Sequence, residues 1–211
     1  MARTLDAKCR MCRRAGTKLF LKGERCFTPK CAIVKRNYPP GVQGAKRARP
    51  RLTSYAIQLK EKQKCHHHYR ISEKQMSNYF TKAVRKQGDT GLFMQQMLEQ
   101  RLDNAVYRLG LARSRDEARQ TVGHGFILVN GRKVSIPSYQ AKVGDRITLK
   151  KGAETSKRFQ ELPQLQDKES EKLPSWLIRE SQFEGKVVGL PQGDDLAAPF
   201  DMKIIVEFYS R

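Results

Sequence analysis

The pattern of apolar and polar positions is most regular between residues 98 and 150, where it predicts two helices followed by a small antiparallel sheet. At the start of this stretch apolar residues recur three or four positions apart, which is typical of one face of a helix. Gly110 follows the last of them and is expected to end this helix. The apolar face consists of Leu98, Leu102, Ala105, Val106 and Leu109.

A second, shorter helix is predicted after a short link. Ser114 and Glu117 have the spacing of a capping box, which satisfies backbone N–H groups at the start of a helix. Gly123 and Gly125 favour an end near residue 123, because glycine adopts positive φ without a steric penalty. Positions four apart are neighbours on a helix. One face therefore carries Ala118 and Val122, and another carries Arg115 and Arg119.

The sheet is predicted from a hairpin signal. Asn130-Gly131 stands between two apolar runs and is typical of a two-residue hairpin turn. The turn Val143-Gly144-Asp145 then leads into a third short strand over residues 147–149. The predicted unit is thus helix, helix, hairpin and strand.

The rest of the chain has weaker patterns. A polar helix is expected over residues 54–64, and another begins at Ser72, which forms a capping box with Gln75. Apolar alternation predicts strands over residues 186–190 and 202–209. Residues 152–172 are expected to form a loop or a solvent-facing helix, and the single Trp is assigned to the core. The second helix has an apolar stripe of Met76, Tyr79, Phe80, Ala83 and Val84.

The charge of the chain is strongly positive and unevenly distributed. The net charge of the 211 residues is +21, of which residues 1–50 contribute +12 and residues 151–211 contribute −2. Such a positive field repels itself unless a polyanion neutralises it, so nucleic acid is the expected partner. A membrane surface is disfavoured, because no basic helix carries a bulky apolar face. The acidic balance of the last 61 residues favours protein neighbours instead.

Four cysteines near the start of the chain predict a zinc site. Cys9-x2-Cys12 and Cys26-x4-Cys31 are two close pairs, and residues 18–23 are expected to fold back and bring them together. Four thiolates leave no open coordination position, so one Zn²⁺ with a structural role is predicted. So few apolar residues surround the pairs that this segment is expected to need the metal to fold. The flanking cations are expected to lower the pKa of the thiols.

A second cluster, Cys65-His66-His67-His68, has a weaker metal-site pattern. Adjacent helix residues point in different directions, so Cys65 and His68 alone are placed to share an ion. Histidines on the surface or facing RNA are the preferred interpretation. No segment is apolar enough to span a bilayer or to serve as a signal-peptide core, so the protein is expected to stay in a reducing cytosol without disulfides.

Several motifs together resemble a known family, the bacterial ribosomal protein four of the small subunit, in a zinc-binding form. The resemblance covers nearly the whole chain and includes the four cysteines. Other matching motifs are Tyr38-Pro39-Pro40-Gly41, Arg47-x-Arg49, Arg101-Leu102-Asp103-Asn104-x-Val106-Tyr107-Arg108-Leu109-Gly110, Ser114-Arg115-x-x-Ala118-Arg119-Gln120, His124-Gly125, Val129-Asn130-Gly131, Pro137-Ser138-Tyr139, Gly144-Asp145 and Val206-Glu207-Phe208-Tyr209-Ser210-Arg211.

The resemblance implies an α+β protein: an N-terminal zinc knuckle and a helical domain, with an inserted helix-helix-hairpin RNA-binding module that carries a short antiparallel sheet. The expected divisions are residues 1–45, 46–97, 98–151 and 152–211, the last packing back on the helical domain. The family implies no enzymatic activity and no small-molecule substrate. It implies binding to 16S rRNA at a multi-helix junction in the cytoplasmic ribosome, or in that of an organelle of bacterial ancestry. Further implications are early assembly of the subunit body, contacts with small-subunit proteins five and twelve, translational accuracy, and a place near the path by which mRNA enters.

The residues expected to bind RNA carry positive charge or lie in the matching motifs. Folded RNA is recognised through its shape and phosphates, for which Arg and Lys are suited. His124 is expected to cap a helix end or to touch RNA. The candidates are Arg3, Lys8, Arg10, Arg13, Arg14, Lys30, Arg36, Lys46, Arg47, Arg49, Arg51, Ser114, Arg115, Arg119, Gln120, His124, Arg132, Lys133, Ser138 and Tyr139.

Two other functions fit parts of the sequence. An RNA-modifying or tRNA-binding enzyme can share the central module, but no nucleophile paired with a base is found after residue 150. A zinc-dependent DNA regulator needs an exposed recognition helix, and no well-capped helix follows the cysteines. The sequence therefore favours a structural RNA-binding protein.

Overall fold

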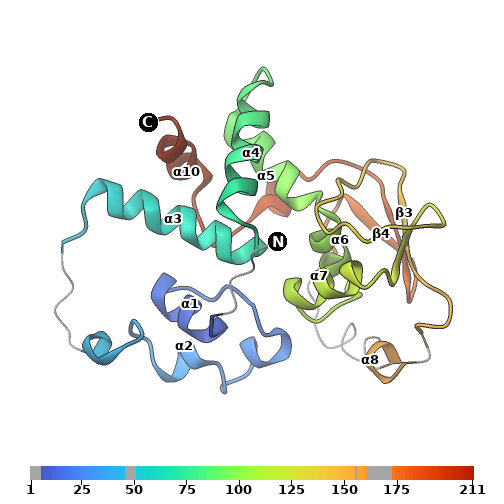
Figure 1. The fold of residues 1–211 in the computed structure, drawn as a ribbon, viewed down its shortest axis with the longest axis horizontal. Helices are drawn as coiled ribbons and strands as arrows, with labels where there is room; N and C mark the ends of the chain where they lie inside the picture. Colours follow the sequence, from blue (N-terminus) through green and yellow to red (C-terminus); the bar gives the residue numbers. More distant parts are fainter. Residues whose placement is uncertain (1–5, 46–50, 155, 161–172) are drawn as a thin grey trace. The chain divides into compact units, whose positions relative to one another are not determined.

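The computed structural model describes residues 6–45, 51–154, 156–160 and 173–211. The chain forms two compact units, one of Met1–Gln95 with Ala198–Arg211 and one of Gln96–Ala197. Among the described residues, no helix has the length and apolar character needed to cross a bilayer. The ribbon of each unit is shown in Figure 1.

The N-terminal segment of the first unit consists of short helices joined by tight turns. Gly16, with φ of 76°, ends the first helix, and positive φ at Phe20 and Gly23 turns the chain back as the sequence predicted. Met11, Cys12, Leu19 and Leu21 form a small core of their own. The elements are α1 (Lys8–Ala15), η1 (Gly23–Cys26), α2 (Ala32–Lys35) and η2 (Val42–Ala45).

Longer helices complete the first unit. The predicted capping box of Ser72 and Gln75 is present, and Thr53 caps the helix before it. The C-terminal helix lies beside this group in Figure 1 and packs against it: Gln58 donates to Glu207 at 3.1 Å. The elements are α3 (Ser54–Tyr69), α4 (Glu73–Val84), α10 (Met202–Tyr209) and the first part of α5 (Thr90–Glu99), whose residues 96–99 belong to the second unit.

The second unit is a five-stranded antiparallel sheet in the order β2-β1-β3-β5-β4, with two helices packed on each other. The predicted hairpin is confirmed: Asn130 and Gly131 both have positive φ, at 51° and 77°. Trp176 is 1% exposed in the core of this unit. The elements are α6 (Leu102–Arg108), α7 (Arg115–Gly123), β1 (Ile127–Val129), β2 (Arg132–Lys133), β3 (Arg146–Leu149), α8 (Lys157–Gln160), β4 (Leu177–Ser181), β5 (Glu184–Val187) and η3 (Gly193–Leu196).

Two predictions about secondary structure are wrong. Residues 202–209 form α10 and not a strand, because Asp201 caps a helix there and buries Met202 and Ile205 on one face. The helix expected through Leu98 and Leu109 is broken after Glu99, where Arg101 instead makes a β-bridge with Gln140. Alternation of apolar residues does not distinguish a strand from a short helix that is apolar on most of its surface.

The division of the chain differs from the one expected. Residues 177–187 form β4 and β5 and extend the sheet of the second unit, so this unit does not stop near residue 151. The part of the C-terminal segment that joins the helical unit is Ala198–Arg211. The fold is nevertheless the expected mixture of helices and one antiparallel sheet.

Candidate nucleic-acid interface and thiol cluster

The four predicted zinc ligands line one small cavity. Cys9 and Cys12 stand on α1, Cys26 ends η1, and Cys31 immediately precedes α2. The cavity has a volume of about 20 Å³ and its walls include Leu21 and Ile33. A space of this size holds a single water-sized sphere, so it suits one ion and no larger group. The fold therefore brings together four sulfurs from three separate elements.

The thiols are electrostatically coupled to one another. Burial raises the pKa of the Cys12 and Cys26 thiols, and the charges of the neighbouring cysteines raise it further. Backbone N–H groups oppose this shift: Leu19 donates to Cys12, and Lys22 donates to the sulfur of Cys26 at 3.4 Å. The flanking cations were expected to lower the pKa of the thiols, but the pKa of Cys12 and of Cys26 is raised, because burial is the larger effect. Without a bound cation, Cys12 and Cys26 are protonated thiols at neutral pH.

The described residues do not contain a preformed coordination shell. No three His, Cys, Asp or Glu side chains in residues 6–45, 51–154, 156–160 and 173–211 are arranged so that they could hold a metal ion. The four thiols share a cavity, two of them accept backbone hydrogen bonds, and their donor atoms suit Zn²⁺. The donor chemistry of the four residues thus fits the ion.

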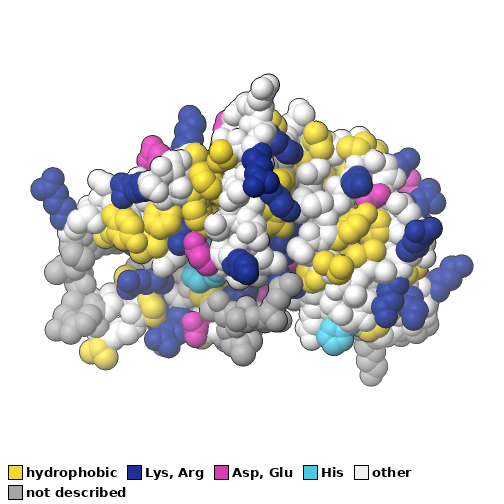
Figure 2. Space-filling model, turned by 45° about the horizontal axis from the view of Figure 1, so that its top comes forward, with side chains coloured by type: hydrophobic (Ala, Val, Ile, Leu, Met, Phe, Trp, Pro, Cys, Tyr) yellow, Lys and Arg dark blue, Asp and Glu magenta, His cyan; other side chains and the backbone are white. Residues whose placement is uncertain are grey.

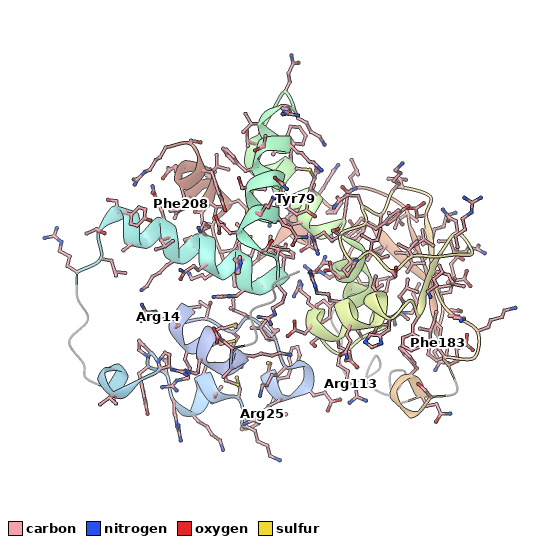
Figure 3. The ribbon with its side chains drawn as sticks, in the orientation of Figure 1. Arg14, Arg25, Tyr79, Arg113, Phe183 and Phe208 are labelled. Carbon is pink, nitrogen blue, oxygen red and sulfur yellow. The ribbon has the colours of Figure 1, made fainter. Side chains whose placement is uncertain are left out.

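Cations lie on more than one side of the thiol cluster. Arg14 and Arg25 mark two such sides in Figure 3. Arg13 is engaged within the protein: its guanidinium donates to the carbonyl oxygens of Tyr38 and Pro39 at 2.9 and 3.2 Å, and it lies 4.7 Å from the centre of the Tyr38 ring. The predicted RNA-binding residues that are exposed here are Arg10, Arg14, Lys30, Arg36 and Arg51, whereas Lys8 and Arg13 are half-buried. Arg3, Lys46, Arg47 and Arg49 lie outside the described residues.

A buried network of charged and polar groups occupies the core of the second unit. Asp103 accepts hydrogen bonds from Arg101 at 2.6 Å and from Arg119 at 3.2 Å. Glu99 accepts hydrogen bonds from Asn104 and Arg108 at 2.8 and 3.1 Å. These two buried carboxylates, Asp103 and Glu99, are thus each paired with at least one guanidinium group, which offsets the cost of burying their charge.

Arg115 belongs to this network. Its side chain is buried, lies 4.6 Å from the centre of the Tyr107 ring, and donates to Asn104. Ser114 is also buried and accepts from the backbone N–H of Glu117 at 3.3 Å. The expectation that Arg115 and Ser114 face RNA is therefore corrected: the first holds α6 to α7, and the second caps α7. Arg119 is only partly exposed and is bound to Asp103.

Glu117 completes the start of α7 in an unexpected way. Its carboxylate accepts from the backbone N–H of Arg113 at 2.8 Å, instead of from that of Ser114 as a capping box would have it. The helix start was thus predicted correctly from Ser114, but the second hydrogen bond is shifted by one residue.

The exposed candidates of the second unit lie at the end of α7 and on the first hairpin. Gln120, His124, Arg132 and Lys133 are all exposed. The His124 ring lies parallel to that of Phe126, with ring centres 6.1 Å apart. This surface offers positive charge and an accessible aromatic face, which are the groups that bind phosphates and unstacked bases. Figure 2 shows Lys and Arg side chains gathered over the unit that carries the sheet.

Gly125 shapes this surface. A Cβ atom at Gly125 would lie 2.1 Å from Cε of Lys133, so the aliphatic part of the lysine rests on the glycine backbone. Gly125 also has φ of 73°, a conformation that other residues rarely adopt. The His-Gly pair therefore positions both the imidazole and the lysine of the hairpin.

Ser138 and Tyr139 lie in a loop that the start of α6 holds in place. The backbone N–H groups of Leu102 and Asp103 donate to Tyr139 and Pro137 at 2.8 and 3.2 Å. The Tyr139 hydroxyl donates to Asp145, and burial together with this carboxylate raises the pKa of the hydroxyl. Both candidates are partly exposed.

Sequence reasoning missed the organising role of Asp103 and Asn104. Both are buried, at 4% and 1% exposure, and they bind the guanidinium groups of Arg119 and Arg115. The available signal was two polar residues within an apolar helical pattern, close to several arginines in the sequence. Buried polar groups need partners, so such residues indicate an internal network.

The Cys65 and histidine cluster is less exposed than expected. Cys65 and His68 are buried, and the His68 ring contacts those of Tyr69 and Phe200. The Nδ1 atoms of His66 and His67 lie 3.5 Å apart, and both residues are half-buried. Packing within the helical unit therefore explains His68.

Two family matches and several relatives were found for this chain. Residues 3–99 match the ribosomal protein S4/S9 N-terminal domain, and residues 100–147 match the S4 domain. Small ribosomal subunit protein uS4 of Halothermothrix orenii is 52% identical over 212 residues. Those of Koribacter versatilis and Thermus thermophilus are 50% and 48% identical over 213 residues. All three alignments cover 100% of this chain and 100% of the relative.

Proposed function

The chain belongs to the family of small ribosomal subunit protein uS4, and from this premise we propose that it is a structural component of the small ribosomal subunit that binds 16S rRNA. The main support for this function is the identity of about 50% between this chain and uS4 proteins over its full length. Membership of a family of structural ribosomal proteins also confirms that the chain is not an enzyme.

The exposed cations supply the physical basis of RNA binding. His124, Arg132 and Lys133 are exposed at the end of α7 and on the first hairpin of the second unit. The exposed cations Arg10, Arg14, Lys30 and Arg36 belong to the N-terminal segment that carries the thiol cluster. Lys and Arg that neutralise phosphates release bound counterions, so affinity falls steeply as salt rises. Because a folded junction presents phosphates and unstacked bases in a fixed arrangement, duplex DNA is a poor substitute.

We also propose that Cys9, Cys12, Cys26 and Cys31 hold one structural Zn²⁺. Support comes from the common cavity, from the sulfur donor set, and from the shortage of other core residues in this segment. A bound zinc ion stabilises the thiolate forms, which burial alone disfavours, and its binding free energy contributes to folding. Arg13 then connects the folded segment to the backbone of Tyr38 and Pro39.

Protein neighbours form a further part of the proposal. We infer that small-subunit proteins five and twelve contact this chain, in a region that affects translational accuracy and lies near the path by which mRNA enters. The acidic balance of residues 151–211 supports protein contacts at this end, in contrast to the basic remainder. Early assembly of the subunit body is consistent with direct binding to rRNA.

The function is tested by comparing two ligands at the same salt concentration. The protein is titrated with a 16S rRNA fragment that contains the junction and with duplex DNA of equal phosphate number. Binding to the rRNA at least 100-fold tighter than to DNA is expected for specific recognition. Equal affinity for both would contradict the proposal.

A further inference from the structure

A cleft of about 190 Å³ lies between α1 and α3 in the first unit. Figure 1 shows the two helices side by side. The apolar residues that line the cleft are Met11 and Ala15 from α1, Ala56 and Leu59 from α3, and Leu52. None of these belongs to the thiol cluster or to the hairpin surface.

The α3 side of the cleft is a regular helical face. Ala56, Lys60, Gln63 and His67 follow one another at intervals of three or four, so they lie in a row along the helix. The apolar residues thus form a floor, and the polar residues of the same helix lie along it.

Positive charge surrounds this floor. Arg14 comes from α1, and Figure 3 shows it on the side of α1 that faces α3. Lys60 and Lys64 come from α3, and Lys64 donates to Glu61 at 2.5 Å. Two cations, Arg14 and Lys60, are therefore placed to bind a phosphate at the rim of an apolar cleft.

Two further groups can recognise a base edge. The Gln63 amide is exposed and provides both donors and an acceptor. The His67 imidazole is neutral at physiological pH, because burial and the nearby His66 and Arg70 lower its pKa to about 4. Its Nδ1 atom lies 3.5 Å from that of His66, so Nε2 is the nitrogen that can meet a base edge.

We propose that this cleft binds one unpaired nucleotide of ribosomal RNA, with its base against Met11, Ala56 and Leu59 and its phosphate at Arg14 and Lys60. Sequence-specific recognition of RNA usually acts on bases that have left the stack, which an apolar cleft with a cationic rim accommodates. The inference rests on the proposed function. A peptide occupant is less suited, because the rim carries cations that attract phosphate.

The decisive experiment combines protein and RNA variants. Full-length protein is titrated with an rRNA junction fragment in which each unpaired nucleotide in turn is replaced by an abasic one. For the wild type, one abasic position should lower affinity about tenfold, as expected for loss of one stacked base. In Ala56→Phe, which fills the cleft, affinity for intact RNA should fall by a similar factor, and that abasic position should cause no further loss.

Controls separate a blocked cleft from a misfolded protein. Gln63→Ala changes an exposed side chain and should lower affinity for the intact RNA several-fold. It should cause no such loss for the RNA that is abasic at the nucleotide bound in the cleft. Lys60→Ala should weaken binding, whereas Lys82→Ala, which removes an exposed cation from α4, should not. The ratio of wild-type affinity to Gln63→Ala affinity is measured for the intact RNA and for every abasic RNA. If this ratio is the same for all of them, the cleft proposal is wrong.

The possible failures are distinguishable. If wild-type protein does not bind the intact junction, the proposed function fails. If it binds and Ala56→Phe, Gln63→Ala and Lys60→Ala all bind equally well, the cleft proposal alone fails. A photocrosslinking residue at position 63 should attach to one rRNA nucleotide in cells. Attachment to another ribosomal protein would show a protein occupant and overturn the inference.

Discussion

The guanidinium of Arg115 donates a hydrogen bond of 2.8 Å from Nε to Oδ1 of Asn104. This contact joins α7 to α6 inside the second unit, where both side chains are buried. An arginine that charge alone would place at an RNA surface is therefore an internal support. In this unit the proposed RNA-binding residues are therefore the exposed ones on the hairpin and at the end of α7.

Arg115→Ala should destabilise the second unit by about 2–4 kcal/mol, because a buried acceptor loses its charged donor. Charge reversal at this position should be worse still. Urea unfolding followed by the fluorescence of Trp176, the single Trp, measures the change. Arg132→Ala is the matched control and should stay within about 0.5 kcal/mol of the wild type.

Reversing charge on the hairpin should weaken RNA binding without changing stability. In Arg132→Glu with Lys133→Glu, both side chains are exposed, and affinity for the rRNA junction should fall about 10- to 100-fold. The slope of log affinity against log salt should fall by about 2, one for each lost phosphate contact. Lys186→Glu with Lys203→Glu makes the same charge change on exposed residues of the C-terminal segment, and it should leave both quantities near those of the wild type. An unchanged salt slope in the hairpin variant would place the RNA elsewhere.

Replacing Cys9 and Cys12 by Ser should remove bound zinc and unfold about the first 45 residues, by the coupling of metal binding to folding. Hydrogen exchange should accelerate in residues 6–45 and stay slow in the sheet of the second unit. Cys65→Ala is the control: it removes a buried cysteine from α3, outside the thiol cluster, and should keep one zinc per chain. Native protein that contains no zinc by metal analysis would refute the site.

The stability of the first unit should fall as pH is lowered from about 6.5 to about 4. Burial, His66 and Arg70 lower the pKa of His67 from 6.5 to about 4, although Asp6 opposes this. In that interval the unfolded state binds a proton at His67 that the folded state does not, so acid favours unfolding. In His67→Gln the free energy of unfolding should fall less between pH 6.5 and pH 4 than in the wild type. The difference should be about 1 kcal/mol or less, because the imidazole is partly exposed. Denaturant unfolding by far-UV circular dichroism at several pH values measures the difference; parallel curves for both proteins would contradict the assignment.

Local rules predicted the parts of the fold that local interactions determine. The hairpin at Asn130-Gly131 follows from residues that accept positive φ, and the starts of α4 and α7 follow from Ser72 and Ser114. The meeting of the two cysteine pairs followed from their spacing and the turn between them. Each of these features depends on residues close together in the sequence.

Long-range packing decided what the sequence could not show. Residues 202–209 become a helix because they cover α3, more than 130 residues earlier in the chain, where Gln58 meets Glu207. Strand β4 exists because it pairs with β5 at the edge of the sheet. Arg115 and Arg119 lie four residues apart on the same face of α7 and carry the same charge, yet Arg115 is buried and Arg119 is partly exposed. The difference follows from where their partners Asn104 and Asp103 lie on α6.

Binding of this chain to 16S rRNA in the ribosome is best tested by crosslinking in intact cells, with its RNA and protein neighbours mapped by sequencing and mass spectrometry. We expect crosslinks from Arg132, Lys133 and His124 to nucleotides of one 16S rRNA junction, within particles that sediment as small ribosomal subunits. Recovery of the chain free of ribosomes, with these side chains attached to no RNA, would contradict it.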